Sequence, residues 1–343
     1  MRLAELIETR RFRLVEGAIE APGPGQVQVR VAAVGVCGSD LHAYAEGSVG
    51  DLPNRFPMVL GHEPTGVLVQ AGPGVSDWAP GQRVALEPAI YCYHCEFCQT
   101  GHHNVCAHLR FLSQPGEPGF FRERVNLPAS NLLPLPKNLG LAEGTLFEPL
   151  AVVLHSLQLA RLQAGETAAV FGAGPMGLLT IAALKLLGAA RVWAIEPLEH
   201  RRQLALGLGA DAALDPAAVD PARQILDDTG QRGVDLALDC VTKGDSINQC
   251  LRATRHAGRV AITGIPSETL VGLEFHAMRR KELALFNVRR SSGESRWALD
   301  LLRDQPQRFT PMITHLRPLE EIGPAFAMLE QYGDGVGKLV IEL

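Results

Sequence analysis

The chain has 343 residues, of which 46% are hydrophobic and 20% are charged, and its formal net charge is -5. This length exceeds what one hydrophobic core usually supports, so it predicts two domains. A net negative charge gives no electrostatic footprint for binding nucleic acid or an anionic membrane. We therefore expect small molecules and copies of the same chain as partners.

The start of the chain, residues 1–17, mixes charged and apolar residues and contains no apolar core of a signal peptide. The sequence contains no run of 18 apolar residues, which would indicate a membrane-spanning helix. We expect a cytoplasmic protein, in which thiols stay reduced. In that compartment seven cysteines indicate metal binding or catalysis before they indicate disulfides.

The first 150 residues are predicted to be rich in β-strands. Segments 27–37, 65–72 and 82–88 carry alternating apolar residues, many of them valine, and are bounded by glycine and proline. This pattern is typical of strands.

From residue 151 onward, predicted strands alternate with predicted helices, which favours a parallel, doubly wound α/β sheet. The strands are expected at 168–174, 191–196, 234–240, 258–265 and 283–288, and the helix after the first strand at 176–188. A last strand, at 337–343, needs a sheet to join. We expect it to return to the N-terminal β domain, so that the domains are 1–150, 151–286 and a returning segment 287–343.

Four cysteines follow the spacing C-x2-C-x2-C-x7-C, which is a strong signal for a structural zinc site with a closed ligand shell. Disulfides are the alternative in an oxidising compartment, and neighbouring histidines at 94, 102, 103 and 108 are possible competing ligands. The predicted ligands are Cys92, Cys95, Cys98 and Cys106.

A G-x-G-x-x-G motif lies directly between a predicted strand and a predicted helix, which is the context of a dinucleotide-binding turn. Glu196 ends the next strand, where an acid accepts hydrogen bonds from the adenosine ribose and repels a 2'-phosphate. NAD is therefore favoured over NADP, although Arg201 and Arg202 follow closely. The motif residues are Gly172, Gly174, Pro175, Met176 and Gly177.

Three further polar stretches, at 36–42, 60–64 and 146–150, present a cysteine, a histidine or a glutamate beside glycine or proline. Together these side chains are mixed S, N and O ligands, which suit a zinc ion that keeps a coordination position open for substrate. Each stretch alone is a weak signal, because a lone Cys37 or His62 is more often a packed core residue.

These motifs, in this order and spacing, resemble the zinc-dependent medium-chain dehydrogenases over nearly the whole chain, most closely the sorbitol (polyol) dehydrogenase branch. The resemblance implies a GroES-like β-rich catalytic domain and a Rossmann domain with strand order 3-2-1-4-5-6. It implies catalytic zinc ligands at Cys37 and His62, with Glu63 and Glu148 completing the shell directly or through water. Asp40 matches the acid that orients the ligand histidine.

The resemblance also implies a mechanism and further site residues. Ser39 matches the hydroxyl that accepts the substrate proton, and His42 the outlet of the proton relay. Hydride then passes to NAD, and the chain binds two Zn²⁺ ions, one catalytic and one structural. The residues implied in substrate binding are Tyr44, Arg289 and Arg290; those implied in cofactor binding beyond the motif are Arg201 and Gly264.

The expected reaction is oxidation of a secondary alcohol in a polyol or sugar-like substrate by NAD, giving a ketone. Threonine-type amino alcohols, sugar phosphates and sugar acids are alternatives, since two adjacent arginines also suit a carboxylate or a phosphate. A catalytically silent dinucleotide-binding protein is the alternative outside the enzymes. Self-association as a dimer or a tetramer is expected from the family.

Overall fold

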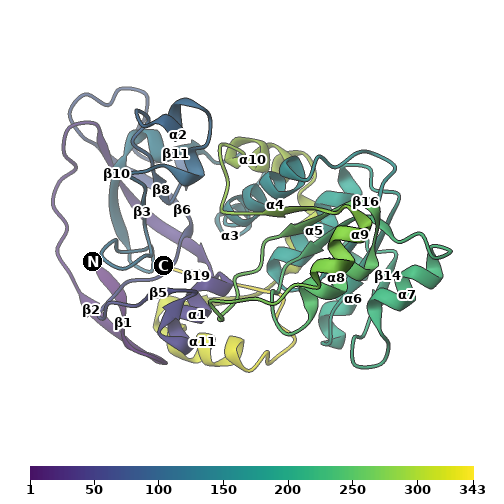
Figure 1. Ribbon diagram of the computed structural model, residues 1–343. Helices are drawn as coiled ribbons and strands as arrows, with labels where there is room; N and C mark the ends of the chain where they lie inside the picture. Colours follow the sequence, from purple (N-terminus) through teal and green to yellow (C-terminus); the bar gives the residue numbers. More distant parts are fainter. The chain divides into compact units, whose positions relative to one another are not determined.

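A computed structural model describes all residues, 1–343, and divides into two compact units. Unit 1 comprises Met1–Glu148, Ser295–Pro306 and Ile313–Leu343, and unit 2 comprises Pro149–Glu294 and Gln307–Met312. Figure 1 shows both chain termini within unit 1. Residues 287–294, which the sequence analysis assigned to the returning segment, belong to unit 2.

Unit 1 is built on a sheet with strand order β11-β7-β6-β3-β19-β18, to which β10 adds by pairing with β3. Valines at alternate positions of β3 point into the core, where they meet side chains of β6 and β7. The strands are β3 (Gln26–Gly35), β6 (Glu63–Ala71), β7 (Arg83–Leu86), β10 (Arg124–Pro128), β11 (Leu132–Pro134), β18 (Ile313–Pro318) and β19 (Lys338–Glu342).

The last strand, β19, pairs antiparallel with β3, with Val340 opposite Gly35. On its other side β3 pairs antiparallel with β6, with Gly35 opposite Glu63. The end of β3, the start of β6 and the start of β19 therefore lie together, although they are far apart in the sequence.

Shorter elements surround this sheet. Helix α1 (Gly38–Glu46) begins directly after β3: the Asp40 side chain accepts a hydrogen bond from the Cys37 backbone N–H, and Gly47, with φ of 75°, ends the helix. The other elements are β1 (Arg2–Glu8), β2 (Arg11–Glu16), β4 (Ser48–Val49), β5 (Leu52–Pro53), β8 (Ala89–Ile90), α2 (Glu96–Gln99), β9 (Arg110–Phe111), α3 (Leu141–Gly144), α10 (Ser295–Asp304) and α11 (Ile322–Glu330).

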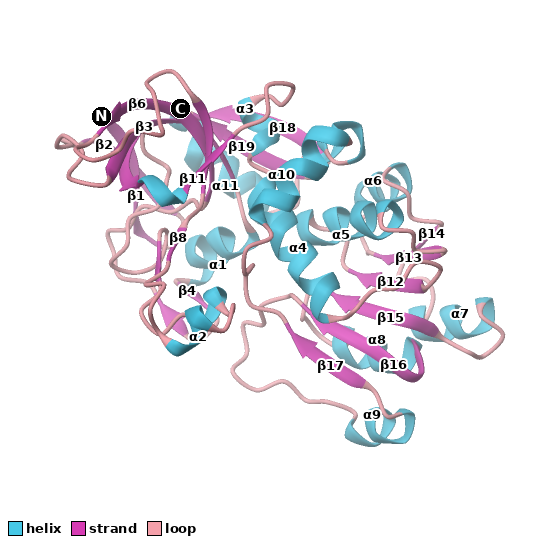
Figure 2. Cartoon of the chain, turned by 90° about the horizontal axis from the view of Figure 1, so that it is seen from above, coloured by secondary structure: helices cyan, strands magenta, loops and turns pink.

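Unit 2 contains a six-stranded parallel sheet with the order β14-β13-β12-β15-β16-β17, which Figure 2 shows side by side. Numbered along the chain, this is the order 3-2-1-4-5-6, so the predicted Rossmann topology is confirmed. The strands are β12 (Thr167–Phe171), β13 (Arg191–Ile195), β14 (Ala212–Leu214), β15 (Val234–Asp239), β16 (Thr254–Ile262) and β17 (Ala284–Asn287).

Helices cover both faces of this sheet. Ala169, Phe171 and Trp193 lie on one face and form a core with side chains of α7 and α8. The alternate residues of the central strands are also buried, as expected for a parallel sheet covered on both sides. The helices are α4 (Phe147–Leu159), which begins in unit 1, α5 (Pro175–Leu186), α6 (Glu199–Gly207), α7 (Pro221–Asp228), α8 (Ser246–Ala253) and α9 (Phe275–Lys281). No helix in the structure is both long enough and apolar enough to cross a membrane.

Candidate metal centres and dinucleotide site

The four predicted cysteines come together around α2. The Sγ atoms of Cys92 and Cys98 are 4.0 Å apart, those of Cys95 and Cys106 are 3.9 Å apart, and those of Cys106 and Cys92 are 3.5 Å apart. A zinc ion bound tetrahedrally by thiolates at about 2.3 Å sets its sulfur atoms about 3.8 Å from one another. The spacing therefore fits a zinc site with four cysteine ligands, and all four thiols are free of disulfides.

Backbone N–H groups favour the thiolate form of three of these cysteines, whereas burial raises the pKa of the fourth, Cys98, to about 12. The N–H groups of Cys92 and His108 donate to Cys106 Sγ, and that of Cys95 donates to Cys92 Sγ. Backbone hydrogen bonds from residues 98 and 107 lower the pKa of Cys95 to about 6. The nearby histidines are not part of this metal-binding group. His94, for example, contacts the Cys92 carbonyl oxygen through Nδ1 at 2.7 Å.

A second group of potential ligands is formed by Cys37, His62 and Glu63, whose ligand atoms lie within 4.8 Å of one another. Cys37 follows β3 as the residue before α1, and the other two enter β6. The antiparallel pairing of β3 with β6 brings these three side chains together. One thiolate, one imidazole and one carboxylate form the mixed donor set of a zinc centre that keeps an open position.

Asp40 connects the segments that carry these ligands. Its Oδ1 atom accepts hydrogen bonds from the Gly61 backbone N–H at 3.0 Å and from Ser113 Oγ at 3.1 Å, and lies 3.4 Å from His62 Nδ1. Although this contact is close, the buried His62 Nδ1 atom has no hydrogen-bond partner in the structure. Asp40 is 1% exposed, so its charge acts on His62 with little screening by water.

Lys338, which was not predicted as a site residue, forms an ion pair with Glu63 although both side chains are only 1% exposed. The Nζ atom of Lys338 also donates a hydrogen bond of 2.9 Å to the carbonyl oxygen of Val36, the residue before Cys37. Gly35 makes room for this pair, because a Cβ atom there would overlap the Glu63 carboxylate. The only sequence signal was a single lysine at the start of an otherwise apolar strand.

Glu148, the fourth predicted ligand, lies outside the group of three but close enough to interact with it electrostatically. Burial raises the pKa of Glu148 to about 8; His62 and Lys338 oppose this rise, whereas Glu63 and Glu87 add to it. Glu87, which the sequence analysis also missed, accepts a hydrogen bond of 2.5 Å from Ser295 Oγ. Three carboxylates near one centre favour a bound cation.

Helix α1 carries the residues expected in proton transfer and one expected in substrate binding. Ser39 and His42 are partly exposed, and His42 Nδ1 lies 2.9 Å from Glu46 Oε1, one turn further along the helix. Tyr44 is 3% exposed and packs between Phe12 and Phe326 in the core of unit 1. The expectation that Tyr44 faces substrate therefore finds no support in this packing.

The glycine-rich turn of unit 2 has the geometry that dinucleotide binding requires. Gly172 has a φ of 92°, Gly174 precedes α5, and Pro175 occupies the first position of that helix. A Cβ atom at Gly177 would overlap the Gly172 carbonyl oxygen. The N-terminus of α5, with Met176 in its first turn, is thus open to a phosphate group.

Glu196 is 4% exposed and is fixed to this turn. Its carboxylate accepts hydrogen bonds from the backbone N–H groups of Ala173 at 2.8 Å and of Leu198 at 3.1 Å. Arg202 donates to the carbonyl oxygens of Glu196 and Pro197 and pairs with Glu199 and Asp215. Arg201 Nη1 lies 3.6 Å from the position of a Cβ atom at Gly174, beside the expected phosphate site.

Gly264 follows β16 at the same edge of the sheet. A Cβ atom there would overlap Thr242, and one at Gly172 would overlap Val241. The turns after β12, β15 and β16 are therefore packed against one another. Arg289 is exposed and Arg290, with a φ of 53°, is half-buried, both in unit 2. Their predicted contact with substrate stays a prediction.

The fold and these sites define a zinc-binding dehydrogenase. The family model described as "Alcohol dehydrogenase GroES-like domain" matches residues 23–137. The family model described as "Zinc-binding dehydrogenase" matches residues 175–304. The chain belongs to the zinc-dependent medium-chain dehydrogenases, near their sorbitol dehydrogenase branch. Members of this family are oxidoreductases that act on CH–OH groups.

Its relatives include a 2-dehydro-3-deoxy-L-galactonate 5-dehydrogenase of Pseudoalteromonas atlantica, which is 33% identical over 98% of this chain and 97% of the relative. Human sorbitol dehydrogenase is 32% identical over 95% of this chain and 91% of its own. A solved structure of a zinc-binding dehydrogenase from Sinorhizobium meliloti 1021 bound to NADP has a TM-score of 0.91 and 30% identity, with 100% and 99% of the two chains covered.

Proposed function

We propose that this protein oxidises a secondary alcohol of a polyol or sugar-like substrate with NAD, producing a ketone. The observation that carries this proposal is the convergence of Cys37, His62 and Glu63 in unit 1, backed by Asp40. A catalytically silent dinucleotide-binding protein has no use for this group of ligands. We therefore favour an enzyme.

When bound, zinc would supply Lewis acidity at the substrate hydroxyl, and NAD would supply a hydride acceptor. The chain itself holds the donor set in place. Asp40 ties the helix that follows Cys37 to the segment that carries His62, and Lys338 ties Glu63 to the end of β3. Both supports are buried, so they hold the ligands in one geometry before metal binds.

The proton path is proposed along α1, from Ser39 to His42. His42 is about one-third exposed and contacts Glu46, which is 40% exposed. This contact fixes the ring orientation while leaving an edge of the imidazole near water. Such a position suits a group that releases a proton to solvent.

NAD is proposed over NADP because of how the basic residues after β13 are engaged. The Arg202 guanidinium is already occupied by two carbonyl oxygens and two acids, and Glu196 places a carboxylate at the turn. Arg201 lies beside Gly174, where it suits the pyrophosphate shared by both cofactors. A 2'-phosphate would thus meet negative charge without a free cation from Arg202.

The substrate class is proposed from the donor set and from the relatives, among which sorbitol, xylulose and idonate enzymes all occur. Sugar acids are the second candidate, because Arg289 and Arg290 suit a carboxylate and because two relatives carry names of sugar-acid dehydrogenases. Threonine and sugar phosphates complete the range to be tested.

The test is a panel of alditols, sugar acids, sugar phosphates, threonine and simple alcohols, offered with NAD or NADP while NADH or NADPH formation is followed. We expect polyols or sugar acids with NAD to give the highest kcat/KM. Arg289→Ala and Arg290→Ala, compared on an alditol and on its sugar acid, separate hydroxyl recognition from carboxylate recognition. Turnover that survives Cys37→Ser at full rate contradicts the zinc mechanism.

We also propose that the chain self-associates through unit 2. The segment after β16 exposes Ile265, Leu270, Val271 and Phe275, and it leads to β17, the last strand in the sheet order. Exposed apolar groups beside an unpaired strand edge favour pairing with a second copy. Light scattering on Leu270→Glu and on the unchanged chain tests this proposal: the variant is expected to have the lower mass.

A further inference from the structure

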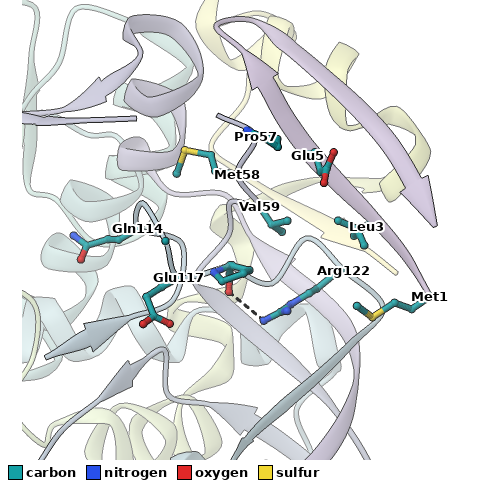
Figure 3. Close-up of a pocket in the computed structure, with 11 residues that line it drawn as sticks. Met1, Leu3, Glu5, Pro57, Met58, Val59, Gln114, Glu117 and Arg122 are labelled. Carbon is teal, nitrogen blue, oxygen red and sulfur yellow. Dashed lines mark hydrogen bonds between the residues drawn. The ribbon is translucent and has the colours of Figure 1, made fainter. Parts of the chain in front are cut away.

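A pocket of about 280 Å³ opens on unit 1. Figure 3 shows its lining, which comes from β1, from the segment before His62 and from the segment before β10. None of the lining residues is a proposed zinc ligand. Most of them are apolar, and three have charged side chains: the lining comprises Met1, Leu3, Glu5, Pro57, Met58, Val59, Gln114, Gly116, Glu117, Pro118 and Arg122.

The two acids of the pocket are already neutralised by arginines outside it. Glu5 accepts a hydrogen bond of 2.7 Å from Arg13. Glu117 accepts two from Arg110, at 2.6 and 2.9 Å, in a bidentate pair. Their charges are therefore compensated without help from the third charged residue.

That third residue, Arg122, has no acidic partner in the structure. The only hydrogen bond of its side chain runs from Nη2 to the Pro118 carbonyl oxygen at 3.1 Å, which is the dashed line in Figure 3. Its Nε atom is buried and has no partner. Burial lowers the pKa of Arg122 to about 10, which still leaves the side chain charged at neutral pH. A half-buried cation with unused donors and no counter-charge is costly unless an anion binds it.

We propose that this pocket binds a small organic monocarboxylate, whose carboxylate pairs with Arg122 and whose apolar part contacts Leu3, Met58 and Val59. The planar guanidinium matches a carboxylate in a bidentate arrangement. The volume lies near the lower end for ligand pockets and suits a fragment-sized molecule rather than a bare inorganic ion. A dianion is disfavoured, because Glu5 and Glu117 also line the pocket.

The same segments continue into the metal centre. Gly119 donates a backbone hydrogen bond to Val59, three residues before His62, and Ser113 donates to Asp40. The pocket thus shares its walls with the ligand-bearing segments, although none of the proposed zinc ligands lines it. The inference does not depend on the proposed function, because it rests on Arg122 and its surroundings alone.

The test is isothermal titration of the intact protein with benzoate, and with benzamide as its neutral analogue. Arg122→Gln is expected to weaken benzoate binding about tenfold or more, because charge-assisted hydrogen bonds are lost. Arg124→Gln is the matched control. It removes the same charge two residues further along the chain, where Arg124 donates to Gln28 Oε1 outside the pocket, and should change the benzoate affinity less than about twofold.

Two further variants keep the test decisive. Leu3→Trp narrows the pocket without removing its charge and is expected to abolish benzoate binding. Cys37→Ser should bind benzoate as the unchanged chain does, which distinguishes this pocket from a carboxylate held at the catalytic zinc. Equal binding to Arg122→Gln and the unchanged chain, loss of binding in Cys37→Ser, or no saturable binding to the unchanged chain would each overturn the proposal.

Discussion

The two metal centres of unit 1 are built in opposite ways. The four-cysteine lobe takes all its ligands from residues 92–106, and backbone N–H groups of the same segment support them. The other centre joins Cys37 to His62 and Glu63 across two strands, and its supports come from Asp40 and from Lys338 in the last strand. A local segment can thus encode a closed site, whereas the open site requires strands that are distant from one another in the sequence.

The two centres also differ in how the charges of their ligands are balanced. Four thiolates fill the tetrahedral shell of a zinc ion and leave it no place for substrate. In the second centre one thiolate, one imidazole and one carboxylate are accompanied by a buried lysine that already pairs with the carboxylate. This centre therefore depends on a balance of buried charges that the lobe does not need.

The largest effect is expected from Cys95→Ser in the lobe. A structural zinc site of this kind contributes about 10 kcal/mol of binding free energy to local folding, so losing one thiolate should unfold residues 91–107 locally. Metal analysis should show the loss of one zinc ion per chain, and limited proteolysis should cut within the lobe. If Cys95→Ser retains both zinc ions, the assignment of the lobe as a zinc site is contradicted. Cys37→Ser is the control, because it should leave the lobe protected from proteolysis.

Cys37→Ser should have the next largest effect, and on activity rather than on folding. Without the thiolate, transition-state stabilisation by the metal is lost, which is worth several kcal/mol and corresponds to about 10³-fold or more in kcat/KM. Steady-state kinetics beside a thermal melt would check this. A melt that shifts as strongly as the activity would mean that Cys37 acts mainly in folding.

Much of this comparison was predictable from the sequence, for a physical reason. Local spacing encodes the four-cysteine lobe and the glycine-rich turn, so the ligand cluster and the turn before α5 lie where the sequence analysis expected them. The alternation of strands and helices encodes the parallel sheet, whose strand order is confirmed. These features depend on neighbours along the chain.

Features that depend on distant pairing were missed. Lys338 reaches Glu63 only because β19 pairs with β3, and no local pattern announces that contact. The ring of Tyr44, which was expected to face substrate, packs against Phe12 and Phe326, and its contact with substrate stays a prediction. Helix α1 was also not predicted. Its sequence is short, and its start is stabilised by the hydrogen bond from the Cys37 backbone N–H to the Asp40 side chain.

Lys338→Met sharpens the comparison by removing the buried cation. Breaking one side of a buried ion pair leaves an uncompensated charge, so the free energy of unfolding should fall by about 3 kcal/mol. Urea unfolding with and without a chelator would measure it. The loss should be smaller with zinc present, because the metal compensates Glu63.

The matched control for this variant is the double substitution Lys338→Met with Glu63→Gln, which removes both charges. It should recover most of the lost stability, since no charge is then buried alone. If the single and the double variants are equally unstable, Lys338 contributes through packing and not through its charge.

A smaller effect is expected from Asp40→Asn. An asparagine has only one acceptor oxygen, so it can accept a hydrogen bond from the Cys37 N–H or from the Gly61 N–H but not from both, and it no longer places a negative charge 3.4 Å from His62 Nδ1. Loss of such a supporting carboxylate typically weakens metal binding by about 10- to 100-fold. Competition with a chromophoric chelator should show weaker binding of one zinc ion and unchanged binding of the ion in the lobe.

Ser113→Ala removes a single donor to the Asp40 carboxylate and should weaken metal binding less, by about 1 kcal/mol. If Asp40→Asn weakens the binding of both zinc ions equally, Asp40 stabilises unit 1 as a whole rather than the open centre.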